Sequence, residues 1–262
     1  MPETEDRAPE TTLDAWHGGR LELVQPKSGH RAGSDAALLA AALDLAEGRV
    51  VDVGAGVGAV GLALARRQER LNVDLVEIDP ATARLASENA ARNGLDGRVR
   101  TLCLDVADAP ARRHAGLLDN SAEAVVTNPP YLTPGSVRVS PDAARARAYV
   151  MPPTETGGAP IAAWIRACLA LLRPGGRFVM IHRPDALGEI LAALPNRLGA
   201  VAILPIHPRA GEPSHRVLVA GVKGSKAPLR LASALVLHGS DGKLTHEADA
   251  IHRGEALIDW SA

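Results

Sequence analysis

The stretch Asp52-Val53-Gly54-Ala55-Gly56-Val57-Gly58-Ala59-Val60-Gly61 decides the fold of this chain. It follows the apolar segment 49–53, which has the pattern of a buried strand, and it opens the segment 57–68, which has the pattern of a helix. Glycines at such a junction let a ligand approach the backbone closely, and the start of the helix favours negative groups. The residues from Gly56 to Gly61 also satisfy GxGxxG, the pyrophosphate fingerprint of nicotinamide enzymes, so the stretch alone leaves the cofactor open.

Strands and helices alternate outward from this stretch. The expected strands are 49–53, 72–78, 98–104, 123–127 and 177–181, and the expected helices are 57–68, 80–93, 158–172 and 184–194, with a loop from 105 to 122. This alternation predicts a parallel sheet with right-handed crossovers. Two further apolar segments, 201–206 and 216–220, are joined by so short a loop that they must pair antiparallel. We therefore expect an α/β, Rossmann-like fold with a mostly parallel seven-stranded sheet and an antiparallel last strand.

The flanking segments complete the expected domain organisation. The predicted parts are a disordered tail at 1–14, an N-terminal hairpin and helix lead-in at 15–48, the main domain at 49–222, and a C-terminal strand and helix at 223–262 packed on the same domain. In the lead-in, 19–25 alternates like a strand, and Ser34-Asp35 is expected to cap a helix that continues to about Ala46. In the C-terminal part, we expect a strand at 231–238 and a helix from about Glu247.

Composition sets outer limits on function. The chain has 262 residues and a net charge of −1, so any RNA contact must come from a local basic patch. Cys103 and Cys168 are far apart and belong to no metal-ligand motif, so we expect buried thiols, a reducing compartment and no metal site. The acidic start has no apolar core and no segment is long enough to span a membrane, so the expected location is the cytoplasm.

Asn128-Pro129-Pro130-Tyr131 carries the most specific chemistry. Two prolines end the strand 123–127 and leave a stiff loop. The Asn128 side-chain oxygen and the Pro129 carbonyl are two fixed acceptors that could take both hydrogens of an exocyclic amine and aim its lone pair at an electrophile. Tyr131 could stack on the flat group that carries this amine. Pro130 would line the same substrate pocket.

Acidic residues end the neighbouring strands. Asp52 stands two residues before Gly54, where a carboxylate would repel a pyrophosphate but attract the ammonium group of S-adenosylmethionine. Glu77 ends the second strand and could accept both hydroxyls of a ribose in either cofactor class. Asp105 ends the third strand and could meet an adenine amino group. Four consecutive strand ends with polar residues mark the edge at which open α/β sheets bind ligands.

With these residues the chain resembles the class I S-adenosylmethionine-dependent methyltransferases, and within them the NPPY amino-methyltransferases. The resemblance rests on Asp52 to Gly58, Val76-Glu77-Ile78-Asp79, Leu104-Asp105-Val106 and Asn128 to Tyr131, and it covers nearly the whole chain from about Gly18. The segments from Gln25 to Leu39 and from Pro213 to Leu218 look like those of bacterial enzymes that methylate adenine N6 beside the anticodon of a valine tRNA. Gly33-Ser34-Asp35 differs from the Gly-Thr-Asp that such enzymes often have, although hydroxyl and carboxylate are kept.

The resemblance implies a role for each matching residue. S-adenosylmethionine would be held by Gly54, Gly56, Glu77, Asp105 and the backbone of Val106, with Ser34, Asp35, Asp52 and Asn128 near its methionine end. Asn128, Pro129 and Tyr131 would serve the target amine. The substrate would be RNA, most simply tRNA, and the basic candidates for gripping it are Arg138, Arg145, Arg147, His207, Arg209, His215 and Arg216. His215 and Arg216 could instead cap a hairpin structurally.

Two other functions remain open at this point. The same NPPY loop occurs in enzymes that methylate a glutamine amide of protein release factors. Only 51 residues precede Asp52 here, however, and we expect the N-terminal helical domain that those enzymes carry to be missing. An NAD-dependent oxidoreductase would use Gly56 to Gly61 and leave Asn128 to Tyr131 without a role. The length and composition of the loop 133–157 are typical of a mobile segment beside a substrate site.

Overall fold

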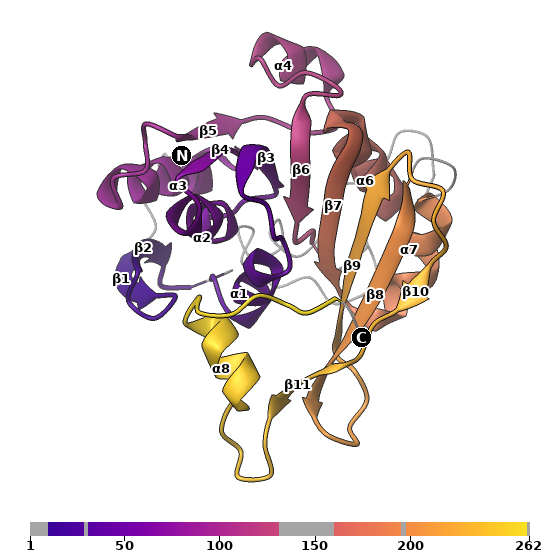
Figure 1. Cartoon of the computed structure of the whole chain (residues 1–262). Coiled ribbons are helices and arrows are strands. Elements are labelled where there is room, and N and C mark those ends of the chain that lie inside the picture. Colours follow the sequence, from indigo (N-terminus) through magenta and orange to yellow (C-terminus); the bar gives the residue numbers. More distant parts are fainter. Residues whose placement is uncertain (1–9, 29–30, 131–159, 195–197, 261–262) are drawn as a thin grey trace, which may run out of the picture.

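A computed structural model describes residues 10–28, 31–130, 160–194 and 198–260 (Figure 1). The strands are β1 (Thr11–Trp16), β2 (Leu21–Pro26), β3 (Glu47–Val53), β4 (Arg70–Glu77), β5 (Val99–Cys103), β6 (Ala122–Thr127), β7 (Leu172–His182), β8 (Leu198–Arg209), β9 (Arg216–Lys223), β10 (Arg230–Leu231) and β11 (Leu235–His238). The helices are α1 (Ser34–Ala41), α2 (Ala59–Arg67), α3 (Pro80–Arg92), α4 (Ala109–His114), α6 (Pro160–Leu171), the 3-10 turn η1 (Pro184–Ala186), α7 (Leu187–Ala193) and α8 (His246–His252).

The main sheet has the predicted topology. Its strand order is β10-β8-β9-β7-β6-β3-β4-β5, and β11 pairs with β8. The strands from β7 to β5 run parallel, whereas β9 is antiparallel to both β7 and β8, so the prediction of an antiparallel last strand in a mostly parallel sheet is confirmed. The described sheet has nine strands instead of seven because the C-terminal part adds β10 and β11 beside β8.

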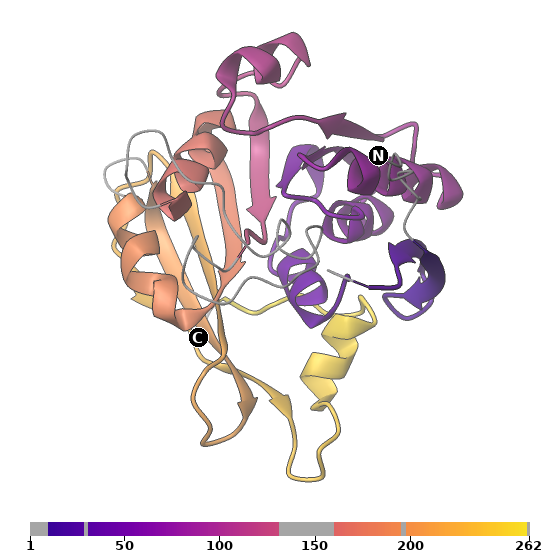
Figure 2. The ribbon, with the colours of Figure 1, turned by 180° about the vertical axis from the view of Figure 1, so that it is seen from behind.

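Two hydrophobic clusters fill the two faces of this sheet. On one face, β2, α1, α2, α3 and α8 pack against side chains such as Leu75 and Val126. On the other face, α6 and α7 cover Val125 and Phe178. α6 and α7 lie behind β7, β8 and β9 in Figure 1 and in front of them in Figure 2. Burial on both faces explains why the central strands are nearly continuous runs of apolar residues.

Several local predictions were wrong, the first at the N-terminal tail. Residues 11–14 belong to β1, which pairs with β2 from Thr11↔Pro26 to Trp16↔Leu21, so the tail predicted at 1–14 is a strand from Thr11 onward. This strand is polar, and Asp14 holds it in place by accepting hydrogen bonds from Arg31 Nη2 at 2.6 Å and from Gln25 Nε2 at 3.1 Å. Composition therefore predicted disorder where pairing with a neighbouring strand gives order.

The other differences concern helix ends, short elements and one cysteine. The N-cap of α1 is Gly33, which makes no side-chain capping bond, so Ser34 does not cap this helix, and α1 ends at Ala41 instead of near Ala46. The loop expected between 105 and 122 contains α4, whose start is capped by Asp108 Oδ1 accepting from Ala111 N at 2.9 Å. The expected strand 231–238 is divided into β10 and β11. Cys168 is buried as expected, but Cys103 is exposed.

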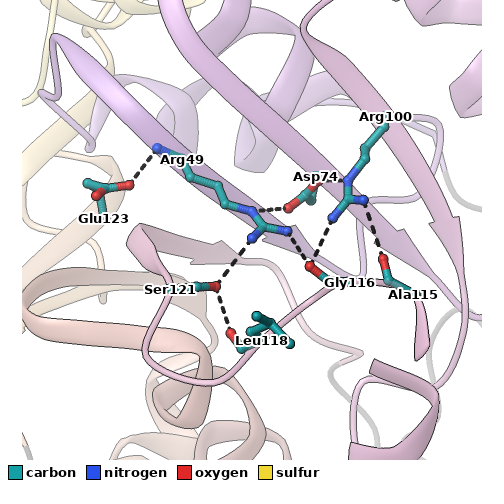
Figure 3. A network of polar contacts seen from close by, with 8 residues as sticks. All are labelled: Arg49, Asp74, Arg100, Ala115, Gly116, Leu118, Ser121 and Glu123. Carbon is teal, nitrogen blue, oxygen red and sulfur yellow. Dashed lines mark hydrogen bonds and ion pairs between the residues drawn. The ribbon is translucent and has the colours of Figure 1, made fainter. Parts of the chain in front are cut away.

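An ionic network centred on the buried Asp74 fixes the segment that leads into β6 (Figure 3). Asp74 on β4 is only 4% exposed and accepts hydrogen bonds from Arg49 Nε at 2.6 Å and from Arg100 Nε. Both guanidinium groups also donate to the Gly116 carbonyl, and Arg49 donates to Ser121 Oγ at 3.3 Å. Three strands thus hold the connection between α4 and β6, and β6 ends directly before Asn128.

Candidate active site

The polar residues predicted at strand ends lie along one edge of the sheet. β6, β3, β4 and β5 are consecutive neighbours, and their last residues are followed by Asn128, Gly54, Ile78 and Leu104. Val53 and Thr127 are directly paired, so Gly54 and Asn128 leave adjacent strands side by side. This juxtaposition joins the glycine stretch to the Asn128 loop, as the sequence predicted.

The glycine stretch combines tight packing with one open position. Gly54, Gly56 and Gly58 have φ values of +72°, +56° and +88°, a region that side chains other than glycine rarely adopt. A Cβ on Gly58 would lie 2.8 Å from Leu75 Cδ1, and a Cβ on Gly61 would lie 2.3 Å from Leu75 Cδ2, so these two glycines let α2 pack on β4. A Cβ on Gly56 would meet no atom of the described residues within 4 Å. Gly56 therefore presents bare backbone to open space, which suits a ligand.

Glu77 lies directly against this open position. Its Oε2 accepts a hydrogen bond from Gly56 N at 2.9 Å, and its Oε1 accepts one from Asp79 N at 2.9 Å. Burial raises the pKa of the Glu77 carboxyl above its usual range, and the two backbone donors oppose that rise. Each oxygen keeps a further lone pair, so the fixed carboxylate can accept from a diol.

Asp52 occupies a different place from the one expected. Its side chain is 2% exposed, and Oδ2 accepts a hydrogen bond from Gly61 N at 2.9 Å behind the glycine stretch. The expectation of a carboxylate at the mouth of the loop is therefore wrong. Gly61 is the third residue of α2, whose N-cap Gly58 has no side chain, so Asp52 satisfies one of the amides that the helix start leaves without a partner. Desolvation raises the pKa of Asp52 from 3.8 to about 7.

The third strand end carries an exposed carboxylate. Asp105 is exposed, and its Oδ1 accepts from Ala107 N at 2.8 Å, which turns the chain after β5. Val106 is 4% exposed and packs in the core. Directly after Glu77 in the sequence stands Ile78, a large apolar side chain that is 58% exposed. Sequence reasoning did not select Ile78 as a site residue, although its place directly after Glu77 was the available signal.

Thr127, which directly precedes Asn128, anchors the start of the Asn128 loop. Thr127 is fully buried, its Oγ1 donates to the Val53 carbonyl at 2.8 Å, and it accepts from Trp164 Nε1 at 2.9 Å. Pro129 is buried, and Asn128 and Pro130 are partly exposed. Trp164 was not predicted as a site residue, because a single tryptophan in a helical pattern is indistinguishable from a core residue. Tyr131, Arg138, Arg145 and Arg147 lie outside the described residues, as does the loop 133–157.

A second polar group lies where α1 begins. Asp35 Oδ2 accepts from Arg216 Nε at 2.9 Å, and Arg216 Nη1 donates to the His215 carbonyl at 2.9 Å. Ser34 Oγ lies 2.6 Å from His252 Nε2, and His252 Nδ1 lies 2.6 Å from the Ala248 carbonyl. Because Nδ1 must donate to a carbonyl, the neutral ring accepts a hydrogen bond from Ser34 through Nε2.

Basic residues of the β8–β9 hairpin are engaged within the hairpin. His215 Nδ1 lies 3.2 Å from the Ile206 carbonyl, and His207 Nδ1 lies 2.5 Å from the Glu212 carbonyl. Arg209 pairs with Glu212 at 3.4 Å. The His215 contact agrees with the structural alternative for that residue, whereas Arg216 pairs with Asp35 on α1. A contact of either residue with RNA stays a prediction.

Within the described ranges, no group of three or more His, Cys, Asp or Glu side chains is arranged to hold a metal ion. The helices among these residues include none with the length and apolar character needed to cross a membrane.

Comparison with known proteins places this arrangement in a family. The model of the methyltransferase small domain matches residues 28–144. The tRNA1(Val) (adenine(37)-N6)-methyltransferase of Aeromonas hydrophila is 30% identical over 81% of this chain and 84% of its own length. The protein of the same name from Serratia proteamaculans is 32% identical over 72% of this chain and 70% of its own length.

A solved structure supports the methyltransferase fold. The crystal structure of a predicted O-methyltransferase from Agrobacterium tumefaciens superposes with a TM-score of 0.72 at 32% identity, covering 87% of this chain and all of that one. The chain therefore belongs to the class I S-adenosylmethionine-dependent methyltransferases, in the family of the bacterial tRNA1(Val) adenine-N6 methyltransferases.

Proposed function

We propose that this protein transfers a methyl group from S-adenosylmethionine to the exocyclic N6 amine of an adenine in tRNA. The observation that carries the proposal is the pairing of Val53 with Thr127, which sets Gly54 and Asn128 side by side at the carboxyl edge of the sheet. The names of the relatives support tRNA as the substrate.

The described residues fit the cofactor. Gly56 offers bare backbone next to open space, and Glu77, held by two amides, can accept both ribose hydroxyls. We assign the adenine to Asp105 and to the backbone of Val106, with the exposed Ile78 as an apolar surface for the ring. We assign the methionine end of S-adenosylmethionine to Gly54, Ser34 and Asp35. Asp52 contributes indirectly, because it holds the start of α2 below the glycine stretch.

The acceptor half of the site has to improve a poor nucleophile. The lone pair of an exocyclic amine is delocalised into the ring, and the Asn128 oxygen and the Pro129 carbonyl can take both N–H hydrogens, which favours a more tetrahedral nitrogen. When bound, S-adenosylmethionine supplies a methyl group on a positively charged sulfur, which the amine attacks directly in line. The product amine then releases one proton to solvent, so the chain needs no strong base and no covalent intermediate.

The remaining roles concern the nucleic acid. We propose Tyr131 and Pro130 as surfaces for the target base and Arg138, Arg145, Arg147, His215 and Arg216 as contacts to the RNA. A tRNA substrate also places the protein in the cytoplasm. Because Asp52 is buried, its charge no longer argues against a pyrophosphate. The case against an NAD site rests on the relatives, which are methyltransferases, and on the Asn128 loop, which an oxidoreductase would leave without a role.

The proposal is tested by offering two acceptors in parallel. The purified protein is incubated with labelled S-adenosylmethionine and either small RNA from cells lacking its gene or release factor, and the labelled product is digested and identified. The proposal predicts label in N6-methyladenosine and none in the release factor. Label in glutamine would move the function to protein methylation, and cofactor binding without label in either acceptor would overturn the substrate assignment.

A further inference from the structure

Trp164 contacts both the glycine stretch, proposed to bind the cofactor, and Thr127, which leads into the Asn128 loop. It lies on α6, and its ring atoms Cζ2 and Cη2 lie 3.0 and 3.2 Å from the point that a Cβ on Gly54 would occupy. The indole thus rests directly on the backbone of the first glycine of the cofactor stretch. A Cβ at Gly54 would press on the ring more tightly than an ordinary van der Waals contact, so the ring would have to shift by a few tenths of an ångström.

The same indole is hydrogen-bonded to Thr127, the residue directly before the Asn128 loop. Its Nε1 donates to Thr127 Oγ1 at 2.9 Å, and Thr127 Oγ1 donates to the Val53 carbonyl at 2.8 Å. The direction of these two linked hydrogen bonds is fixed, because an indole N–H can only donate and a backbone carbonyl can only accept. Thr127 has no solvent contact, so water does not compete for its hydroxyl group.

These two hydrogen bonds join residues that stand directly before residues of the proposed site. Val53 directly precedes Gly54, and Thr127 directly precedes Asn128. A movement of the indole would therefore shift the glycine stretch and the Asn128 loop relative to each other. Methyl transfer depends on the distance and alignment of the amine nitrogen and the methyl carbon, and a misplacement of about 1 Å can cost about 100-fold in rate.

We propose that Trp164 is a positioning residue that sets the alignment of the Asn128 loop with the glycine stretch through Thr127. This inference rests on the proposed function and adds a residue to its machinery. Trp164 acts through Thr127 and Gly54, so its removal lowers the rate of transfer more than it weakens binding.

The test separates binding from transfer. Trp164→Phe keeps an aromatic ring and removes the N–H, and Thr127→Val keeps the shape and removes the hydroxyl group. Each variant is expected to lower the single-turnover rate of methyl transfer about 10- to 100-fold, while the Kd for S-adenosylhomocysteine, measured by calorimetry, changes less than about threefold. The double variant is expected to lose no more than either single variant, because the two groups act as one unit.

Two controls distinguish positioning from general stability. Trp260 Nε1 also donates to a backbone carbonyl, that of Ala42, at 3.0 Å, so Trp260→Phe removes an equivalent bond away from the strand ends. Its transfer rate is expected to match wild type at a temperature where all variants are folded. Thr127→Ser keeps the hydroxyl group and is expected to keep most of the rate that Thr127→Val loses.

The outcomes are distinct. Slow transfer by Trp164→Phe and Thr127→Val, with cofactor binding and the Trp260→Phe rate unchanged, supports the inference. A wild-type rate in Trp164→Phe overturns it, and so does an equal loss in Trp260→Phe. If wild-type protein binds S-adenosylhomocysteine but methylates no acceptor, the proposed function fails first, and the inference fails with it.

Discussion

Asp35 and Arg216 form an ion pair in which Arg216 Nε donates to Asp35 Oδ2 at 2.9 Å, although 181 positions separate them in the sequence. The pair joins the first turn of α1 to the first residue of β9, and the two side chains are 20% and 23% exposed. The sequence had assigned Asp35 to the cofactor and Arg216 to the substrate. Their contact links the two proposed halves of the site.

The first prediction concerns this pair. Arg216→Ala is expected to lower the free energy of unfolding by about 1 to 3 kcal/mol, because the pair is mostly shielded from water. Arg216→Lys is expected to recover only part of the loss, since lysine cannot donate to Asp35 and to the His215 carbonyl with the same planar group. Urea unfolding measures both. Arg209→Ala removes an exposed pair and serves as the control, with an expected loss below about 0.5 kcal/mol.

The second prediction uses the pKa of Asp52. The pKa of this carboxyl is 3.8 before burial and about 7 in the folded protein. The folded state therefore holds a proton that the unfolded state has released, and stability falls as pH rises from about 4 to about 7. Asp52→Asn keeps an oxygen that accepts from Gly61 N but cannot ionise. Its stability is expected to fall less with rising pH, by a difference on the order of 4 kcal/mol over the full range.

Thermal unfolding at several pH values measures this slope. Glu77, whose pKa is also raised, contributes a slope of the same sign in both proteins. Histidines with a lowered pKa, such as His17, contribute the opposite sign in both. The comparison with Asp52→Asn isolates the one carboxyl. Identical slopes in the two proteins would contradict the assignment.

The third prediction compares two glycines with similar backbone strain. Gly54→Ala introduces a Cβ against the Trp164 ring, whereas Gly56→Ala introduces one into open space. Each substitution is expected to lower the free energy of unfolding by about 1 to 2 kcal/mol, because alanine disfavours a positive φ. Gly54→Ala is expected to lose at least about 1 kcal/mol more because of overpacking. Gly56→Ala is expected to fold and to lose affinity for S-adenosylhomocysteine, which calorimetry measures. Equal stability of the two variants would contradict the contact with Trp164.

The fourth prediction concerns the network in Figure 3. Asp74→Ala leaves Arg49 and Arg100, which are 26% and 47% exposed, without their shared carboxylate and is expected to cost about 1 to 3 kcal/mol in the free energy of unfolding. Glu47→Ala removes only an exposed pair with Arg70 and is expected to cost less than about 1 kcal/mol. Denaturant unfolding compares the two variants. A loss below 1 kcal/mol in Asp74→Ala would show that the network does not hold the start of β6.

Sequence patterns predicted the main sheet because its strands are long apolar runs separated by helices of clear periodicity. The glycine stretch and Asn128 were located for the same reason, since their positions follow from the ends of β3 and β6. α4 was missed because six residues are too few to show a helical period. β1 was missed because its order depends on pairing with β2.

Side-chain directions were harder to predict than strand positions. β3 is buried on both faces, so alternation along it does not reveal that Asp52 faces α2. Trp164 is far from Gly54 and Thr127 in the sequence, and only the packing of α6 brings the three together. The partners of Asp35 and Ser34, which are Arg216 and His252, likewise depend on tertiary structure.

The central claim is that Asn128 orients the target amine beside the glycine stretch. The most direct measurement is the rate of methyl transfer by Asn128→Ala, together with its Kd for S-adenosylhomocysteine. Asn120→Ala, which removes a side chain that accepts from Lys223 Nζ, is the matched control. The account predicts that Asn128→Ala binds the cofactor product with a Kd near that of wild type and loses at least about 100-fold in transfer rate. Transfer by Asn128→Ala at the wild-type rate would contradict it.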